Sequence, residues 1–357
     1  MTYQLNKAIH PGVSVAAAIE YLGMTQKGLA DRTELAEKTI SQIINGEASI
    51  TVDTAIKFEN VLGGSAAFWL KLESQYKTTI LRVEQNQKAT DETHFVSAFP
   101  YNELAKREYV DKTRDVIEKV KNLWKFFGVN SLKLVPNIEL AAYRRGYIVD
   151  SDEKRGALAA WLRCGEIVAG KEVLTKLKEY DKQGLRVLLP DIRSMTKMSD
   201  PDFFDKLQEK LAGVGVGLVA VQYFPGTKAS GATRWINQNP VIQLSTFGKD
   251  ADKVWFTLFH EIAHILLHGR KEQFISFTEK SKVTEEIEAD EYAANRLIPA
   301  HEYKKFISNS MCTFESAIRE FADQQDINPG IVVGRMKREG LLDYRALPHL
   351  HSKLGMR

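Results

Sequence analysis

Residues 254–267 read VWFTLFHEIAHILL and place two histidines and a glutamate inside an almost wholly apolar stretch of this 357-residue chain. An apolar segment of this length predicts a helix that is buried all round. His260 and His264 are four residues apart, so both imidazoles would lie on one face of the helix and could reach the same ion. Glu261 follows the first histidine and could act as a general base on a water molecule beside that ion. The pattern predicts a buried helix that carries a zinc site.

A third protein ligand is expected from a later helix, predicted over residues 284–299. Catalytic Zn²⁺ takes three protein ligands and leaves a fourth position for water. Several glutamates compete for the role, and spacing alone does not choose between Glu286 and Glu288. Small alanines in the same helix would let it approach the histidine helix closely. His268 continues the four-residue spacing but lies another turn along, so we interpret it as a histidine at the helix C-terminus.

These stretches resemble the ImmA/IrrE family of metallopeptidase domains, in WFTLFHEIAHILLHG, in EIEADEYAANRLIP and in GATRWINQNPVIQLS upstream. The resemblance covers roughly residues 150–340. In related zincins the third ligand opens a Glu-x-x-Ala-Asp pattern, which implies Glu286 here, with Glu288 as the alternative. The resemblance also implies that Asp290 orients a ligating histidine.

The expected activity is peptide-bond hydrolysis. Zinc would lower the pKa of its water, Glu261 would accept the proton, and hydroxide would attack a peptide carbonyl. The group that stabilises the oxyanion is not identifiable from the sequence, and Tyr292, Arg234 and Trp235 are the candidates.

Two short strands are expected in the same region. One is a buried strand at residues 186–190, and the other directly precedes the histidine helix. In zincins a sheet edge near the zinc aligns the substrate chain by strand addition. The second strand could serve that purpose through Val241, Ile242, Gln243, Leu244 and Ser245.

The first 80 residues predict a separate all-helical domain. Within it, TQKGLA begins a helix with Thr25 as its cap, and a short turn leads into AEKTISQII, which ends at an Asn-Gly pair. Two short helices joined by a tight turn form a helix-turn-helix, whose second helix enters the major groove of DNA. The amphipathic helices are expected at about residues 13–22, 25–32, 36–44, 51–61 and 65–76.

This domain resembles HigA-type antitoxins of the XRE helix-turn-helix class, in TQKGLADRTELAEKTISQIINGEASIT and in FWLKLESQYK. The resemblance implies binding to a double-stranded DNA operator as a homodimer. Charge gives little support, because residues 1–80 carry seven basic and eight acidic side chains and Glu37 lies on the recognition helix. The candidates for contacts with bases or phosphates are Lys27, Lys38, Thr39, Ser41 and Gln42.

Composition limits the class of protein. A net charge of +3 gives no global electrostatic case for nucleic acid. Cys164 and Cys312 lack metal-binding spacing, so we expect free thiols and a cytoplasmic protein. No apolar run has the length of a membrane span, and the first residues lack a signal-peptide core, so no membrane contact is expected.

Together these features predict an α+β fold that is predominantly helical. We expect a helix-turn-helix domain over residues 1–80, a helical connector over 81–150 that could mediate dimer contacts, a zincin-like α+β metallopeptidase domain with a small sheet over 151–345, and a tail over 346–357. The expected function is that of a DNA-binding regulator or antitoxin-like protein whose zinc-dependent endopeptidase cleaves a repressor, a toxin or itself. The alternative is a DNA-binding antitoxin or repressor whose zincin-like domain is a sensor or partner-binding module with little or no proteolysis.

Overall fold

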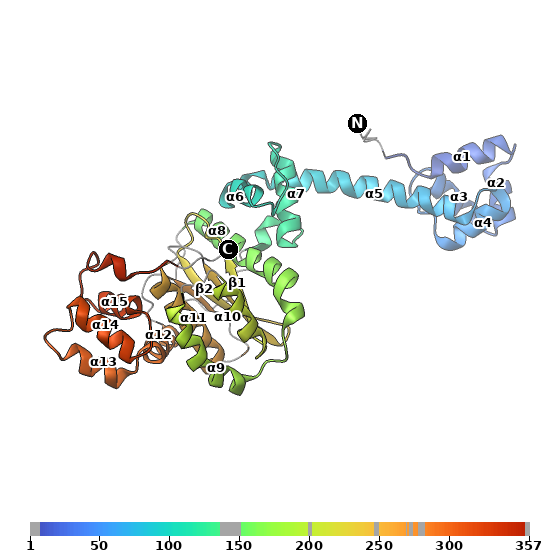
Figure 1. Cartoon of the computed structure of the whole chain (residues 1–357). Helices are drawn as coiled ribbons and strands as arrows, with labels where there is room; N and C mark the ends of the chain where they lie inside the picture. The colour runs from blue at the N-terminus through green and yellow to red at the C-terminus, as the bar shows by residue number, and fades with distance from the viewer. Residues whose placement is uncertain are drawn as a thin grey trace. The chain divides into compact units, whose positions relative to one another are not determined.

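The computed structural model describes residues 8–135, 151–198, 202–245, 250–268, 270, 274–277 and 283–353. The chain divides into two compact units, Met1–Thr93 and His94–Arg357 (Figure 1). The described residues are mostly helical, and their one four-stranded sheet lies in the second unit. This confirms the predicted α+β, predominantly helical class, while the predicted domain boundaries stay predictions.

The first unit is a bundle of short helices followed by one long helix. Thr25, Thr51 and Ser65 each accept a hydrogen bond from the backbone N–H three residues along, which begins the next helix as expected of an N-cap. The helix starts agree with the prediction, but the last helix continues to Asp91. The described helices are α1 (Gly12–Tyr21), α2 (Gln26–Thr33), α3 (Glu37–Ile44), α4 (Val52–Leu62) and α5 (Ala66–Asp91).

An apolar core holds this unit together. Leu29 of α2 and Ile40 of α3 are fully buried and belong to one cluster with Phe58 of α4 and Trp69 of α5. A side chain at Gly12 would overlap the α3 backbone, so α1 packs directly on α3 at that point. The two helices of the helix-turn-helix are therefore fixed by burial of their apolar faces.

The second unit is built on a mixed sheet. Its strands are β1 (Gly217–Val221), β2 (Ala229–Ile236), β3 (Asn239–Ser245) and β4 (Phe274–Phe277), in the order β1-β3-β2-β4. β1 runs parallel to β3, and the other neighbouring pairs are antiparallel.

The predicted substrate-aligning role of residues 241–245 is wrong. These residues form a strand as expected, but β3 is paired with β1 on one side and with β2 on the other. Its backbone N–H and C=O groups are used by both neighbours, so it offers no edge for strand addition. Among the described residues, the edges of the sheet are β1 and β4.

Helices are the main remaining elements in the described part of this unit (Figure 1). The longer ones are α6 (Tyr101–Lys106), α7 (Val116–Phe127), α8 (Asp152–Val168), α9 (Lys182–Ser194), α10 (Phe203–Ala212), α11 (Ala251–Leu267), α12 (Thr284–Leu297), α13 (Ala300–Ile307), α14 (Glu315–Gln324) and α15 (Pro329–Arg338). Shorter helical turns of the chain are η1 (Thr93–Ala98), η2 (Leu132–Leu134), η4 (Ala169–Val173), η5 (Leu174–Lys176), η6 (Met195–Lys197) and η7 (Pro348–Leu350). No described helix combines the length and the apolar character needed to cross a membrane.

The two faces of the sheet meet different helices. Side chains alternate between the faces along a strand, so neighbouring residues of β2 point in opposite directions. Gly231 and Thr233 face α11, where Thr233 bonds to a side chain of that helix. Arg234 and Gln243 instead donate to backbone carbonyls of α8. The sheet thus separates α8 from the histidine helix.

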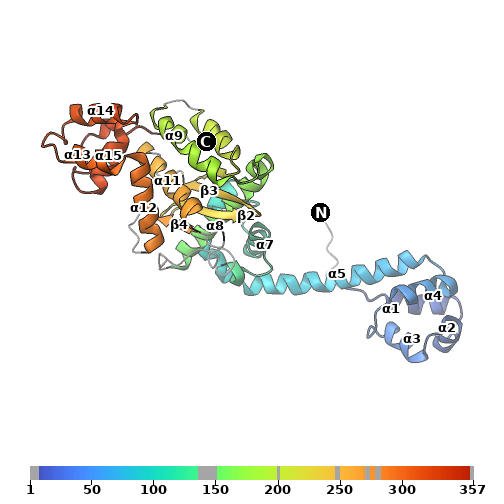
Figure 2. The ribbon, with the colours of Figure 1, turned by 90° about the horizontal axis from the view of Figure 1, so that it is seen from below.

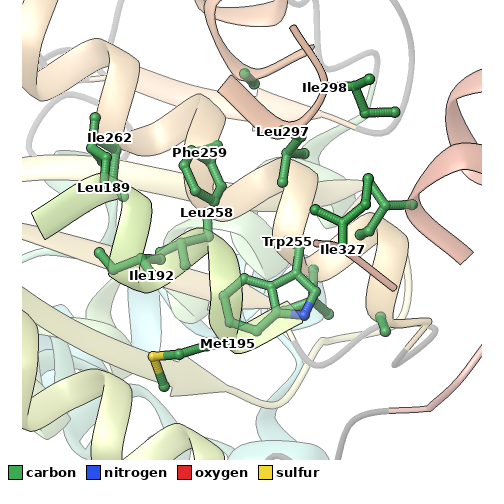
Figure 3. Packing of buried hydrophobic residues seen from close by; sticks show 14 of the residues in the cluster. Leu189, Ile192, Met195, Trp255, Leu258, Phe259, Ile262, Leu297, Ile298 and Ile327 are labelled. Atoms are coloured by element: carbon green, nitrogen blue, oxygen red, sulfur yellow. The ribbon is translucent and has the colours of Figure 1, made fainter. Parts of the chain in front are cut away.

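A large apolar core anchors α11. Trp255, Leu258 and Ile262 lie on the side of α11 that meets Leu189 and Ile192 of α9 (Figure 3), and all five are buried in one cluster. The histidine helix is therefore held by apolar contacts on one side while its polar residues lie elsewhere on its surface.

The predicted strand at residues 186–190 is also wrong, because these residues lie within α9. Leu185, Leu189 and Ile192 are spaced for one face of a helix and are buried there. Pro190 lies inside this helix. The short apolar run was one turn of an amphipathic helix.

From His94 on, the predicted connector belongs to the second unit where it is described. α7 buries Leu123 and Phe127, and Arg107 donates to the backbone carbonyls of Gln222 and Tyr223 just after β1. Residues 136–150 lie outside the described part. The proposed dimer contacts of the connector stay a prediction.

Candidate metal centre

The structure brings together the three side chains predicted to bind metal. The Nε2 atoms of His260 and His264 are 3.0 Å apart. Glu286 places Oε2 3.3 Å from Nε2 of His260 and Oε1 3.2 Å from Nε2 of His264. One ligand atom from each of the three side chains lies within 4.8 Å of the others. Both histidines are buried, with 5% and 2% of their surface exposed.

Close packing of two helices creates this arrangement. α12 lies beside α11 in both views (Figure 1 and Figure 2). Ala289 and Ala293 of α12 are fully buried, and their small side chains permit the close approach that the sequence predicted. Glu286 lies in the first turn of α12 and thereby reaches the histidines of α11.

Each histidine is also held by its other ring nitrogen. Nδ1 of His260 is 2.9 Å from Oδ1 of Asp290, and Arg338 donates to the other oxygen of that carboxylate at 2.6 Å. This places Asp290 where the resemblance implied. Nδ1 of His264 is 2.9 Å from Nδ1 of His268. Both histidines therefore present Nε2 to Glu286.

The donor atoms fit a divalent cation. If each Nδ1 carries the ring hydrogen and donates it outward, both Nε2 lone pairs point toward the Glu286 carboxylate. Three acceptors that converge in a buried site repel one another unless a positive charge lies between them. Two imidazoles and one carboxylate form a set that zinc takes in hydrolytic sites.

The pKa shifts agree with this reading. Burial disfavours a charged His260, but hydrogen bonds with Asp290 and Glu286 outweigh it and raise its pKa to about 10. Burial lowers the pKa of His264 to about 4. Burial acts to raise the pKa of Glu286, but hydrogen bonds with both histidines hold it well below its usual range. These shifts favour a positive charge beside the Glu286 carboxylate, which is the place that a metal cation would take.

Glu261 lies fully buried between α11 and the sheet. Thr233 of β2 donates to its Oε2, and Ser276 of β4 donates to its Oε1, each at 2.6 Å. A side chain at Gly231 would overlap this carboxylate, so the glycine permits the close approach. Burial raises the pKa of Glu261 to about 7, although His260 and the two hydroxyls act in the opposite direction. Neither hydroxyl partner was predicted from the sequence.

The candidates for oxyanion stabilisation are not brought to the cluster by any described contact. Arg234 is wrong for this role, because its guanidinium pairs with Glu166 and bonds to α8 on the face of the sheet opposite α11. Trp235 packs edge-on against Tyr180, and Tyr292 lies beneath an arginine of its own helix. Neither contact involves a predicted metal ligand.

The residues predicted to contact DNA lie on α2 and α3 with accessible side chains. The two lysines are exposed and the other three residues are half-buried, because the apolar side of each helix faces the core. Glu37 is also exposed in the first turn of α3, as the sequence implied. The five residues are Lys27, Lys38, Thr39, Ser41 and Gln42.

Two family models match different parts of the chain. Residues 15–69 match the model described as helix-turn-helix. Residues 219–323 match the model described as the IrrE N-terminal-like domain. The second match spans β2, β3, α11 and α12, which together carry the histidine cluster and its neighbours.

Similar proteins cover a small part of the chain. An uncharacterized HTH-type transcriptional regulator, YddM, of Escherichia coli (strain K12) is 30% identical over 66 residues, which make up 18% of this chain and 70% of that protein. Virulence-associated protein I of Dichelobacter nodosus is 33% identical over 72 residues, 19% of this chain and 65% of that protein. Among solved structures, an addiction module antidote protein of a HigA family from Coxiella burnetii is 30% identical, covers 24% of this chain and 95% of that one, and has a TM-score of 0.23.

Proposed function

Because the chain belongs to the helix-turn-helix family through residues 15–69 and carries an IrrE N-terminal-like domain over residues 219–323, we propose that it is a DNA-binding regulator with a zinc-dependent endopeptidase. Its substrate would be a regulatory protein: a repressor, a toxin or the chain itself. The observation that carries the proposal is the convergence of His260, His264 and Glu286 on one position. The Glu261 carboxylate lies on α11, the helix that carries both histidines. The proposed activity would take place in the cytoplasm, where the operator is, and a palindromic operator would be bound by a homodimer.

Zinc would be held by two ligands from α11 and one from α12. His260 and His264 would bind through Nε2, and Glu286 through its carboxylate. Zinc bound there would polarise a water molecule and a peptide carbonyl. Asp290 keeps the hydrogen of His260 on Nδ1, so that Nε2 is available as a ligand atom.

Glu261 would move the proton. Its carboxylate accepts a proton from water and returns it to the nitrogen of the departing amine, so that one water is added across the peptide bond. Burial against the sheet raises the pKa of Glu261 above that of a solvated carboxylate, which makes the group a stronger base for the first step. Thr233 and Ser276 hold the carboxylate in place through its two oxygens.

The sheet edge nearest this site is β4. The ring of Phe274 stacks on His264 with 4.0 Å between centroids and 12° between planes, so β4 lies against the ligand cluster. Within the described residues β4 pairs only with β2. Its outer edge could therefore bind an extended substrate by strand addition, the role that β3 cannot perform.

Replacement of the base tests the proposed activity. The full-length protein and its Glu261→Gln variant would be analysed for zinc and incubated with the products of neighbouring genes. Glu261 is not one of the proposed zinc ligands, so both proteins should contain zinc. Glutamine keeps an oxygen for one hydroxyl but cannot accept the proton from water. The variant should cleave on the order of 10²–10⁴-fold more slowly. The matched control is Glu291→Gln, which changes an exposed position on α12 and should cleave like the wild type. Unchanged cleavage by Glu261→Gln would contradict the mechanism.

One observation favours a second function. Glu261 is 0% exposed and both of its oxygens already accept hydrogen bonds from hydroxyls, an arrangement that also suits a purely structural carboxylate. In that case the domain would be a sensor or a module that binds a protein partner or toxin. Zinc-dependent binding of a neighbouring gene product, without cleavage and unaffected by Glu261→Gln, would support this function.

A further inference from the structure

We propose that His268 and Glu288 form a hydrogen-bonded relay that fixes His264 as a metal ligand. The inference rests on the zinc site of the proposed function but does not depend on proteolysis. It gives both ligating histidines a carboxylate partner: Asp290 acts directly on His260, and Glu288 acts on His264 through the ring of His268.

The end of α11 brings His268 to this position. The residue follows the last helical turn with an extended backbone, and its N–H still bonds to the carbonyl of His264. Its ring lies beside the outer nitrogen of His264, with 2.9 Å between the two Nδ1 atoms. On the far side, Nε2 is 3.3 Å from Oε2 of Glu288 on α12. A residue that only stabilised the helix end would need neither contact.

The hydrogen positions follow from the partners. The carboxylate of Glu288 only accepts, so the hydrogen of a neutral His268 is on Nε2 and its Nδ1 carries a lone pair. That lone pair accepts the Nδ1 hydrogen of His264, which leaves Nε2 of His264 free to bind metal. If the hydrogen bond ran the other way, from Nδ1 of His268 to Nδ1 of His264, the ring hydrogen of His264 would be on Nε2. That nitrogen could then not bind metal. Glu288 therefore determines the tautomer of His264, although its hydrogen bond is to His268.

Packing holds the relay in line. The side chain of His268 is 7% exposed, and the ring of Phe274 contacts both histidine rings. The Glu288 side chain is 56% exposed, so water weakens but does not remove its effect. We expect the ring of His268 to matter more than the carboxylate.

Zinc affinity of the full-length protein, measured by competition with a chelator, tests the relay. His268→Phe keeps an aromatic ring beside Phe274 but removes the acceptor, and should weaken zinc binding about 10–100-fold. His268→Asn places an amide oxygen near the Nδ1 position and should restore affinity to within roughly threefold of the wild type. Glu288→Ala should weaken binding by roughly threefold to tenfold. Glu291→Ala removes the same charge from the same helix and should leave the affinity unchanged.

The outcomes separate the relay from the proposed function. Equal zinc affinity in the wild type, His268→Phe and Glu288→Ala overturns the relay alone. Weak binding by both His268→Phe and His268→Asn, with Glu288→Ala like the wild type, assigns a packing role and also overturns it. No zinc binding by the wild type overturns the relay together with the metal site. The expected series of affinities without any cleavage would support the relay and contradict the peptidase. Glu288→Ala changes an exposed side chain, so it tests the relay even if His268→Phe does not fold.

Discussion

The two units of this protein bury different kinds of side chain. The described part of the first unit encloses an apolar cluster, and its buried ionisable groups are Glu73 and Glu92. The second unit has a larger apolar core but also buries two histidines, a glutamate and an arginine between its helices and sheet. Apolar burial stabilises a fold without any ligand, whereas a buried cluster of acceptors needs a cation. We therefore expect the first unit to be insensitive to metal and the second to depend on it.

Removal of zinc should have the largest effect and should be confined to the second unit. A ligand at about 1,000 times its Kd stabilises the folded state by roughly 4 kcal/mol. Hydrogen exchange of the full-length protein should show faster exchange in α11 and α12 after chelation and no change in α2 and α3. His264→Ala should abolish the difference, and the exposed His301→Ala should preserve it. Equal exchange of α11 with and without zinc would contradict a metal-dependent unit.

The sequence predicted the cluster only in part, and the reason is geometric. The spacing of His260 and His264 is a property of one helix, so it can be recognised locally. The choice of Glu286 over Glu288 depends on how α12 docks on α11, which spacing did not decide. Thr233 and Ser276 are 28 and 15 residues from Glu261 along the chain and come from separate strands. No local pattern identifies such partners.

The sheet illustrates the same limit. A strand at residues 241–245 follows from their apolar character, and the structure contains it as β3. Its position inside the sheet depends on β1 and β2, which pair with it from both sides. Whether a strand lies at an edge or inside a sheet depends on its neighbours, so the sequence of residues 241–245 alone does not determine it. At residues 186–190 the apolar run was too short to distinguish a strand from one turn of a helix.

Loss of a core side chain in the recognition helix should be the next largest effect. Ile40→Ala removes a fully buried side chain and should cost the first unit about 3 kcal/mol, with faster exchange in α2 and α3 but not in α11. Lys38→Ala, two residues away and exposed, should leave stability within about 0.5 kcal/mol. It should instead weaken operator binding and reduce the salt dependence by about one phosphate contact. Equal losses of stability and equal losses of operator binding in the two variants would mean that the core and the DNA-binding face of α3 are not separate.

The N-terminal helices were predicted well because their signals are local. Helix caps and apolar spacing occur within a few residues of the features they determine, and Leu29, Ile40 and Ile43 form the buried apolar side of α2 and α3. The sequence predicts one helix at residues 65–76 and a helical connector from residue 81, whereas α5 runs without a break to Asp91. Its second half is largely polar and shows no apolar stripe that would indicate this continuity. Leu35 and Ile44 lie at the margin of the same core.

The smallest effect concerns Glu73, a buried carboxylate of the described helical bundle, and it depends on pH. Glu73 of α5 accepts the backbone N–H of Ile50 at 3.0 Å and pairs with Lys77 at 3.2 Å. Burial acts to raise the pKa of Glu73, but these partners outweigh it and hold the pKa below 4.5. A depressed folded pKa means that the ionised group stabilises the fold fully above pH 4.5 and loses this contribution as pH falls below it.

Glu73→Gln should therefore destabilise the first unit by about 1–2 kcal/mol at neutral pH, since glutamine keeps an acceptor but loses the charge. The difference from the wild type, followed by hydrogen exchange in α4, should shrink steadily below pH 4.5 as the wild-type carboxylate is protonated. Glu20→Gln, an exposed position on α1, should show no such pH-dependent difference. A Glu73→Gln effect that stays constant down to pH 3 would assign the residue a packing role. In the second unit the buried histidines and carboxylates would instead surround the proposed cation site.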